Sequence, residues 1–253
     1  MKHKALSLIF ILLLIGCNSK PDEKNKAQSV VDKAIASSGK SKLYHAKLNF
    51  NFRNKAYESY GNCDSMVLNR ITTTEGFIIK DVYKSGENLK RYVNDSLRTI
   101  ADTTATKISE SINSVHYFVQ LPVRLNDEAV QKTYVGLDTI NNTIYHNVKV
   151  NFKKEGGGTD FQDVYLYWFS KDDYKLDYLA YSFVVNGGGI RFREAFNERY
   201  IEGMRFIDYK NYKPKAEDLK LENVFEAFKM NQLELLSRIE NKDIKVKIIN
   251  DQC

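Results

Sequence analysis

The sequence predicts an α+β fold that is rich in β-strands, most of which pair antiparallel. Segments of alternating apolar and polar residues follow one another with only short turns between them, as expected for an antiparallel sheet. The chain has 16 Tyr and 14 Phe but only three Pro, and aromatic residues favour the pleated surface of a sheet. Helical spacing of apolar residues is confined to short segments.

The N-terminal segment has the features of a secretory signal. Lys2 and Lys4 precede a short apolar run, Leu6–Ile15, which is too short to span a bilayer. The run leads into Leu-Ile-Gly-Cys, the pattern of a bacterial lipobox, with Cys17 at its end. We therefore expect removal of residues 1–16, lipidation of Cys17 and attachment to a membrane. The polar residues 17–27 are expected to form a flexible tether.

The remaining residues, 28–253, are expected to form one domain that begins with a helix and continues with strands. Gln28–Ser38 has apolar residues at helical spacing, and Gly39 follows where a C-terminal cap belongs. Tyr44–Phe52 then alternates apolar and polar residues, which predicts a half-buried strand. Three further strands are predicted next: Met66–Thr73, Phe77–Tyr83 and Asn88–Val93.

The alternating pattern breaks between Asp102 and Glu128. Thr103–Ser114 is polar and compatible with either a helix or a loop. Val115–Pro122 is a dense apolar stretch that contains His116 and Tyr117. Because it interrupts the predicted sheet, we expect this stretch to act as a lid.

Strands resume after this interruption and continue almost to the C-terminus. Two glycine triplets, 156–158 and 187–189, lack the Gly-Lys-Ser/Thr ending of a phosphate-binding loop and are predicted to be hairpin turns. Apolar residues at helical spacing within Leu221–Phe228 predict a second helix. The predicted strands are Lys132–Leu137, Thr143–Phe152, Gln162–Ser170, Leu176–Val185, Ile190–Ala195, Met204–Tyr209, Gln232–Ile239 and Ile244–Ile249.

Charge and cysteine content restrict the partners that we expect. The net charge is +6, with basic and acidic residues interspersed, so no nucleic-acid-binding surface is predicted. Once Cys17 is lipidated, Cys63 and Cys253 are the remaining cysteines; whether they pair stays open. We expect a monomer.

The order of several motifs is similar to that of an uncharacterised lipoprotein family of Bacteroidota. The motifs are the helix ending at Gly39, Ser114-Val115-His116-Tyr117-Phe118 with Leu121-Pro122, Tyr165-x-Tyr167-Trp168, Leu179-Ala180-Tyr181, Gly189-x-Arg191-Phe192-Arg193 and Asp208-Tyr209-x-Asn211-Tyr212. This family resembles the lipoprotein-carrier group of LolA/LolB type. The resemblance implies a strongly curved antiparallel sheet, an incomplete β-barrel, with helices covering its opening. It also implies an apolar cavity, which known carriers of this type use for acyl chains.

The sequence offers no recognisable catalytic or metal-binding motif. His45, His116 and His146 do not lie at ligand spacing with another His, Cys or Glu. Neither a Gly-x-Ser-x-Gly elbow nor a Cys–His signature is present. We therefore assign no catalytic residue, no metal site and no cofactor, and an enzymatic role stays open only for His116 with an unidentified acidic partner.

Arg191 and Arg193 alternate with Ile190 and Phe192, so both guanidinium groups lie on one face of a strand. If that face looks into the barrel, the pair could hold a carboxylate or phosphate head beside an apolar tail. If it looks outward, the arginines are surface charges balanced by neighbouring glutamates. The candidate ligand-binding residues are His116, Tyr117, Trp168, Tyr181, Arg191, Phe192 and Arg193.

We therefore expect an envelope lipoprotein, anchored at the outer membrane on its periplasmic face or at the cell surface. Its expected role is binding of a lipid, an acyl chain or another amphiphile in an apolar cavity. The alternatives are an enzyme acting on an envelope substrate, and a structural or interaction lipoprotein with a filled core.

Overall fold

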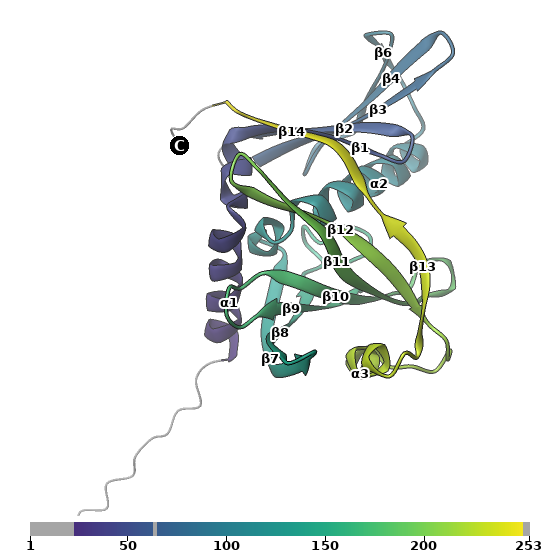
Figure 1. Ribbon diagram of the computed structural model, residues 1–253. Helices are drawn as coiled ribbons and strands as arrows, with labels where there is room; N and C mark the ends of the chain where they lie inside the picture. The colour runs from purple at the N-terminus through teal and green to yellow at the C-terminus, as the bar shows by residue number, and fades with distance from the viewer. Residues whose placement is uncertain (1–22, 63–64, 250–253) are drawn as a thin grey trace, which may run out of the picture.

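The computed structural model describes residues 23–62 and 65–249. The signal segment 1–16 and all three cysteines, Cys17, Cys63 and Cys253, lie outside the described residues. Within the described part, the chain forms two seven-stranded antiparallel sheets with helices packed against them (Figure 1). The predicted β-rich antiparallel architecture is therefore confirmed.

The first sheet contains most of the N-terminal half of the chain and one strand from the C-terminus. Its order is β14-β1-β2-β3-β4-β5-β6, with every neighbouring pair antiparallel. The strands are β1 (Ala46–Phe52), β2 (Lys55–Asn62), β3 (Ser65–Thr74), β4 (Phe77–Lys84), β5 (Lys90–Val93), β6 (Ser96–Arg98) and β14 (Asn241–Ile248).

The second sheet runs through the C-terminal half in the order β13-β12-β11-β10-β9-β8-β7. Its neighbouring strands are also antiparallel. Short turns join them, apart from longer connections before β9 and β13. The glycine triplet 156–158 lies in the connection before β9 and is not the tight hairpin turn that was predicted. The strands are β7 (Val130–Ile140), β8 (Thr143–Phe152), β9 (Val164–Ser170), β10 (Leu176–Phe183), β11 (Gly189–Ile201), β12 (Met204–Pro214) and β13 (Leu233–Ile239).

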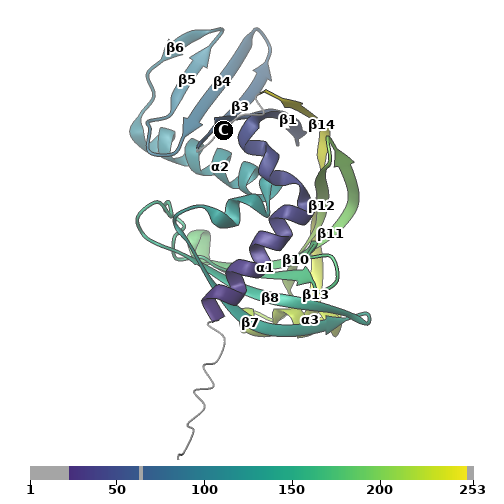
Figure 2. The same cartoon turned by 90° about the vertical axis from the view of Figure 1, so that its left-hand side faces the viewer.

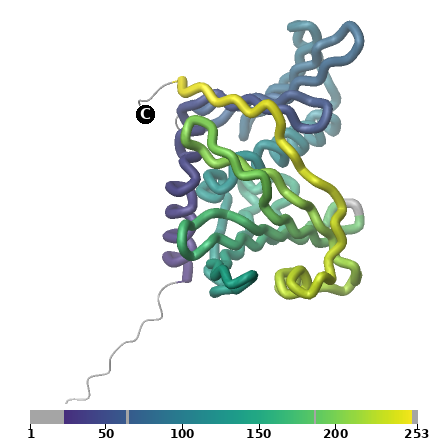
Figure 3. Tube along the Cα trace, viewed as in Figure 1, coloured from purple at the N-terminus to yellow at the C-terminus, as the bar shows by residue number. Residues whose placement is uncertain are grey.

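A bend at Glu240 connects the two sheets. β13 pairs with β12 in the second sheet, and β14, which follows after one residue, pairs with β1 in the first. Figure 3 shows β13 and β14 as one continuous curved path along both sheets. The strands consequently form a curved, unclosed wall, and Figure 2 shows that this wall opens to one side. This is the incomplete barrel that the family resemblance implied.

In the part of the chain that the structure describes, three α-helices pack against this wall. α1 (Glu23–Ser38) lies beside the second sheet, α2 (Asp102–Gln120) crosses beneath the first sheet, and α3 (Val224–Lys229) covers the outside of the second (Figures 1 and 2). Short 3-10 turns occupy Lys40–His45, Val123–Asn126, Val185–Gly187 and Leu221–Asn223.

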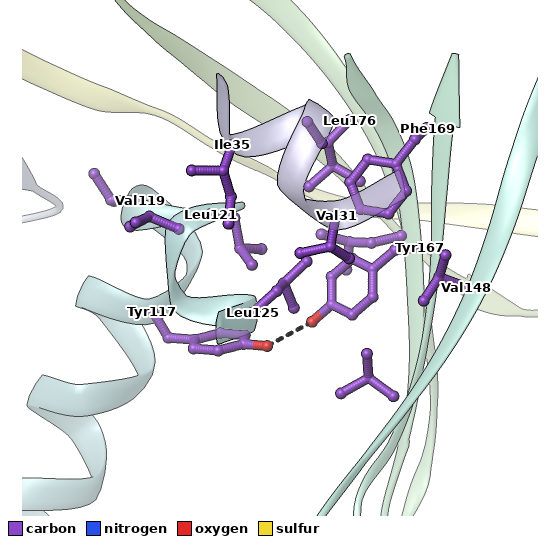
Figure 4. Packing of buried hydrophobic residues seen from close by; sticks show 14 of the residues in the cluster. Val31, Ile35, Tyr117, Val119, Leu121, Leu125, Val148, Tyr167, Phe169 and Leu176 are labelled. Atoms are coloured by element: carbon purple, nitrogen blue, oxygen red, sulfur yellow. Dashed lines mark hydrogen bonds between the residues drawn. The ribbon is translucent and has the colours of Figure 1, made fainter. Parts of the chain in front are cut away.

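The main hydrophobic core lies on the inner side of the wall, between the sheets and the helices α1 and α2. Val31 and Ile35 of α1 pack there with Tyr167 and Phe169 of β9 (Figure 4). A second core lies on the outer side of the second sheet, where Trp168 packs against α3. The second sheet is therefore buried on both faces, which explains why β9 is apolar on both of its faces.

Several elements differ from the prediction. α1 begins at Glu23, so its first five residues fall within the stretch expected to be a tether. α2 continues from Asp102 through the polar stretch and the apolar stretch to Gln120 as one helix. β2 was not predicted because its buried positions are Tyr57 and a small polar residue, Ser59, which accepts a hydrogen bond from Gln120.

Candidate functional site

A cleft opens between α2, the first sheet and the connection from β8 to β9. Its volume is about 1090 Å³, which is large enough for a ligand of lipid size. Residues from both sheets and from α2 line it, among them Met66, Tyr83, Asn113, Phe118, Phe152 and Tyr165. The cleft thus occupies the open side of the curved wall.

A cluster of aromatic rings lies at one side of the cleft, and all of them except Tyr181 line it. Tyr165 on β9 lies at the centre of the cluster, with its ring 5.1 Å from Tyr181, 5.7 Å from Phe152 and 6.1 Å from Tyr117, measured between ring centres. Phe118 of α2 lies 5.8 Å from Tyr181. All but Tyr117 are only partly buried. Strand alternation places Tyr165 and Tyr167 on this inner face, and α2 supplies the opposing rings.

Arg193 points inward from β11 and packs against this aromatic cluster. Its guanidinium carbon lies 3.7 Å from the centre of the Phe118 ring, and Nη2 donates a hydrogen bond to the Tyr181 hydroxyl at 3.1 Å. The residue is 7% exposed. Of the two orientations that the sequence left open, the structure shows the inward one.

Arg191 lies on the same face of β11 but is only half-buried. Its guanidinium carbon is 4.9 Å from the centre of the Phe183 ring, and Nη1 donates a hydrogen bond to the backbone carbonyl oxygen of Ile190 at 2.8 Å. Arg191 therefore sits at the margin of the aromatic cluster, whereas Arg193 sits inside it.

His116 lies in the core beneath the first sheet and does not line the cleft. The side chain is fully buried, and Nε2 donates to the carbonyl oxygen of Asn69 at 3.2 Å. The rings of Phe50 and Tyr57 lie 5.4 and 5.7 Å from the imidazole. Burial lowers the pKa of His116 from 6.5 to about 4, so the ring is neutral near pH 7.

Tyr117, the next residue on α2, contacts both the core and the cleft. Its hydroxyl group lies 2.8 Å from that of Tyr167 (Figure 4). Burial raises the pKa of both phenols above the usual value of 10. The pair therefore remains protonated and acts as a hydrogen-bonded bridge between α2 and β9.

Trp168 and Phe192 lie on the opposite face of the second sheet from Arg193. Trp168 stacks on Phe225 of α3 at 4.7 Å, and its indole nitrogen donates to Asp138 at 2.6 Å. Phe192 stacks on Phe228 of α3 at 4.5 Å. The structure therefore brings together Tyr117, Tyr181, Arg191 and Arg193 from the predicted set, and places these two rings in the filled outer core.

Acidic side chains in the connection from β8 to β9 were not singled out in the sequence. Burial raises the pKa of Asp163 from 3.8 to about 6, with a further contribution from the charge of Asp160. The pKa of Asp160 is raised by burial and by Glu110 on α2. The Thr159 hydroxyl donates to Glu110 at 2.6 Å, which ties the β8–β9 connection to the helix. Only the fold brings these segments together.

Within residues 23–62 and 65–249, no group of three or more His, Cys, Asp or Glu side chains is placed to hold a metal ion. In the same ranges, no helix has the length and apolar character needed to cross a membrane.

A family of unknown function, DUF6503, has a model that matches residues 4–241 of the chain. The chain belongs to the DUF6503 family. The match covers almost the whole of the described structure, including the cleft, Arg193 and both cores. No curated protein matches this DUF6503 chain significantly.

Among solved structures, a DUF1329 family protein shows the fold that this DUF6503 protein shares, and two others are similar to a lesser degree. A DUF1329 family protein from Desulfovibrio piger superposes with a TM-score of 0.50 at 9% identity, covering 88% of this chain and 93% of that one. A putative outer membrane lipoprotein-sorting protein domain from Vibrio parahaemolyticus gives 0.47 at 7%, covering 89% and 95%. A LolA superfamily protein from Nitrosomonas europaea gives 0.45 at 12%, with the same coverage. At these identities, the similarity concerns the fold alone.

Proposed function

We propose that this DUF6503 protein binds an apolar or amphiphilic molecule in the cleft beside α2. The observation that carries the proposal is a cluster of partly exposed aromatic rings on the inner face of an open curved wall. Phe118, Phe152 and Tyr165 line the cleft, and Tyr181 packs against Phe118 and Tyr165. Exposed rings of this kind gain about 25 cal/mol per Å² when an apolar tail covers them. Contiguous exposed apolar surface at a cleft is typical of ligand or partner sites.

The same proposal places the protein at the cell envelope. The chain would be held by a lipid on Cys17, with residues 1–16 removed and residues 28–253 acting as one binding domain. A membrane anchor would keep the cleft close to a source of amphiphiles. The outer membrane, on either its periplasmic or its outer face, is the site that we propose.

An enzymatic role for His116 receives less support from the geometry. The imidazole is enclosed by Phe50 and Tyr57 and is hydrogen-bonded to a backbone carbonyl rather than to a carboxylate. A general base has to reach the substrate directly or through one water molecule. Binding therefore accounts for the cleft better than catalysis by His116 does.

The proposal can be tested with N-phenyl-1-naphthylamine, a neutral probe that fluoresces in apolar surroundings. We expect saturable enhancement by the purified protein and displacement by long-chain amphiphiles. Phe152→Glu, which places a charge in the cleft lining, should weaken probe binding. Tyr200→Glu is the matched control, because Tyr200 is 52% exposed and does not line the cleft. Absence of saturable binding, or equal loss in both variants, would exclude the proposed function.

A further inference from the structure

Arg193 stands out among the buried arginines of this protein. Arg205 is also 7% exposed, and its guanidinium group binds the carboxylates of Asp177 and Glu198. No carboxylate of the described residues lies within ion-pair distance of Arg193. A buried charge without a counter-charge is strongly unfavourable, so Arg193 requires an explanation that Arg205 does not.

The guanidinium group also has unused hydrogen-bond donors. Nε and Nη1 of Arg193 are buried and have no partner among the described residues. Lys40 shows how this chain accommodates a buried cation elsewhere: its ammonium group donates to the carbonyl oxygens of Val119 and Leu121. Burial lowers the pKa of Lys40 well below 10.5, whereas an arginine keeps its proton even when buried. Arg193 therefore remains charged, with two donors available.

Further unsatisfied polar atoms lie next to Arg193 on the inner face of the neighbouring strand. Asn211 on β12 is its direct register partner, and Asn211 Oδ1 is buried without a partner in the described part of the chain. The Tyr209 hydroxyl is likewise buried and unpaired there, and the Arg193 guanidinium carbon lies 5.9 Å from the Tyr209 ring centre. Burial raises the pKa of Tyr209 to about 12, so this hydroxyl remains a donor at neutral pH.

From this cluster we infer that Arg193, with the Tyr209 hydroxyl beside it, forms a subsite for the anionic head of the bound amphiphile. Asn211 Oδ1 is an acceptor and does not bind the anion itself. Two guanidinium N–H groups and one phenol O–H can satisfy the oxygens of a carboxylate or a phosphate. The inference rests on the proposed function, and it adds the charge of the ligand and the direction in which it binds.

The surroundings of the subsite fix that direction. The Phe118 ring covers the Arg193 guanidinium group and itself lines the cleft. This half-buried ring therefore separates the cleft from the inferred subsite, and binding of the head requires the ring to turn aside. The cleft lining has more acidic side chains, such as Glu110, Glu128, Glu155 and Asp160, than basic ones, which are Lys84, Arg98 and Arg124. This excess of negative charge disfavours an anionic head within the cleft itself. The head therefore lies at the buried end beside Arg193, and the tail runs along Tyr165 and Phe152 toward the opening.

The test is displacement of N-phenyl-1-naphthylamine from the full-length purified protein by three competitors with the same tail: hexadecanoate, hexadecyl phosphate and hexadecanol. We expect one or both anions to displace the probe at concentrations at least about tenfold lower than the alcohol, because charge-assisted hydrogen bonds contribute this much. The stronger of the two anions identifies the head group as carboxylate or phosphate.

Variants then assign the preference to this residue. Arg193→Gln should reduce the ratio between anion and alcohol to about one without weakening displacement by hexadecanol. Arg238→Gln, which removes an exposed charge on β13, should leave the ratio unchanged. Arg193→Lys, which keeps the charge but has fewer directed donors, should give an intermediate ratio, and it serves as the readout if Arg193→Gln does not fold.

The outcomes separate the inference from the proposed function. If the probe and hexadecanol bind but the anions show no preference in the wild-type protein, the anionic subsite is refuted and the binding function stands. A preference that survives in Arg193→Gln and in Arg193→Lys alike would also refute the assignment. If the probe does not bind at all, the proposed function fails first.

Discussion

Acidification should destabilise this protein through His116. The ring is enclosed by Phe50 and Tyr57, and burial holds its pKa at about 4, compared with 6.5 for an exposed histidine. Below pH 6.5, the unfolded chain binds a proton that the folded chain does not bind until about pH 4. Burial of the neutral His116 ring therefore contributes fully to the free energy of unfolding above pH 6.5. This contribution is lost as the pH falls toward 4. One pKa unit corresponds to about 1.4 kcal/mol, so the full loss is about 3 kcal/mol.

Urea unfolding of the wild-type protein and of His116→Gln, between about pH 7.5 and about pH 4.5, measures this contribution. Glutamine does not titrate and retains an N–H donor for the carbonyl oxygen of Asn69, while the carboxylates contribute equally to both proteins. We expect the wild-type protein to lose up to about 3 kcal/mol more than the variant over this range. His146→Gln is the comparison, because His146 is only half-buried and should give a smaller difference. Parallel pH profiles for the wild-type protein and His116→Gln would refute the burial argument.

Three further outcomes are expected. Asp81 is fully buried and binds both Arg70 and Arg91, so Asp81→Asn should lower the free energy of unfolding by about 3–5 kcal/mol, measured in urea; a loss below about 1 kcal/mol would contradict the buried network. Trp168 is the only tryptophan and lies under α3, away from the cleft; its emission wavelength should stay constant when an amphiphile binds, and a shift would place the ligand on the wrong face of the sheet. Cys17→Ala should move the protein from the membrane fraction to the soluble fraction of fractionated cells, and unchanged membrane partitioning would exclude lipidation at that residue.

The fold could be predicted from the sequence because its main signal is local. Alternation of apolar and polar residues along a strand such as β1 depends only on one face of the strand being buried. The turns that join two strands into a hairpin are also recognisable, because they favour residues such as Gly and Asn. α2 was harder, because its first half is polar and rich in Thr and Ser, which have low helix propensity. Its helical state depends on packing of residues such as Ile112 beneath a sheet whose strands come from elsewhere in the chain.

The site could be predicted only in part, for a related reason. Arg191, Arg193 and Tyr181 were chosen from their strand pattern, and they do lie together on one face. Trp168 and Phe192 were chosen for the same aromatic character, but they lie on the other face, under α3. Sequence alternation separates the two faces of a strand but does not say which face looks inward when both are apolar. That choice depends on which helix covers which face.

The inner face of the second sheet is apolar at most positions, and this makes Arg193 informative. A core built only for stability would place an apolar side chain there, because a buried guanidinium group is expensive unless it is paired. The protein meets that requirement at Arg205, through Asp177 and Glu198; the half-buried Arg199 is likewise paired with Asp208. At Arg193, no carboxylate of the described residues pairs with the guanidinium group. Local exceptions to otherwise consistent packing are concentrated at functional sites. The position of this exception, directly beneath an aromatic ring that lines the cleft, is therefore the strongest structural argument that the ligand itself supplies the missing negative charge.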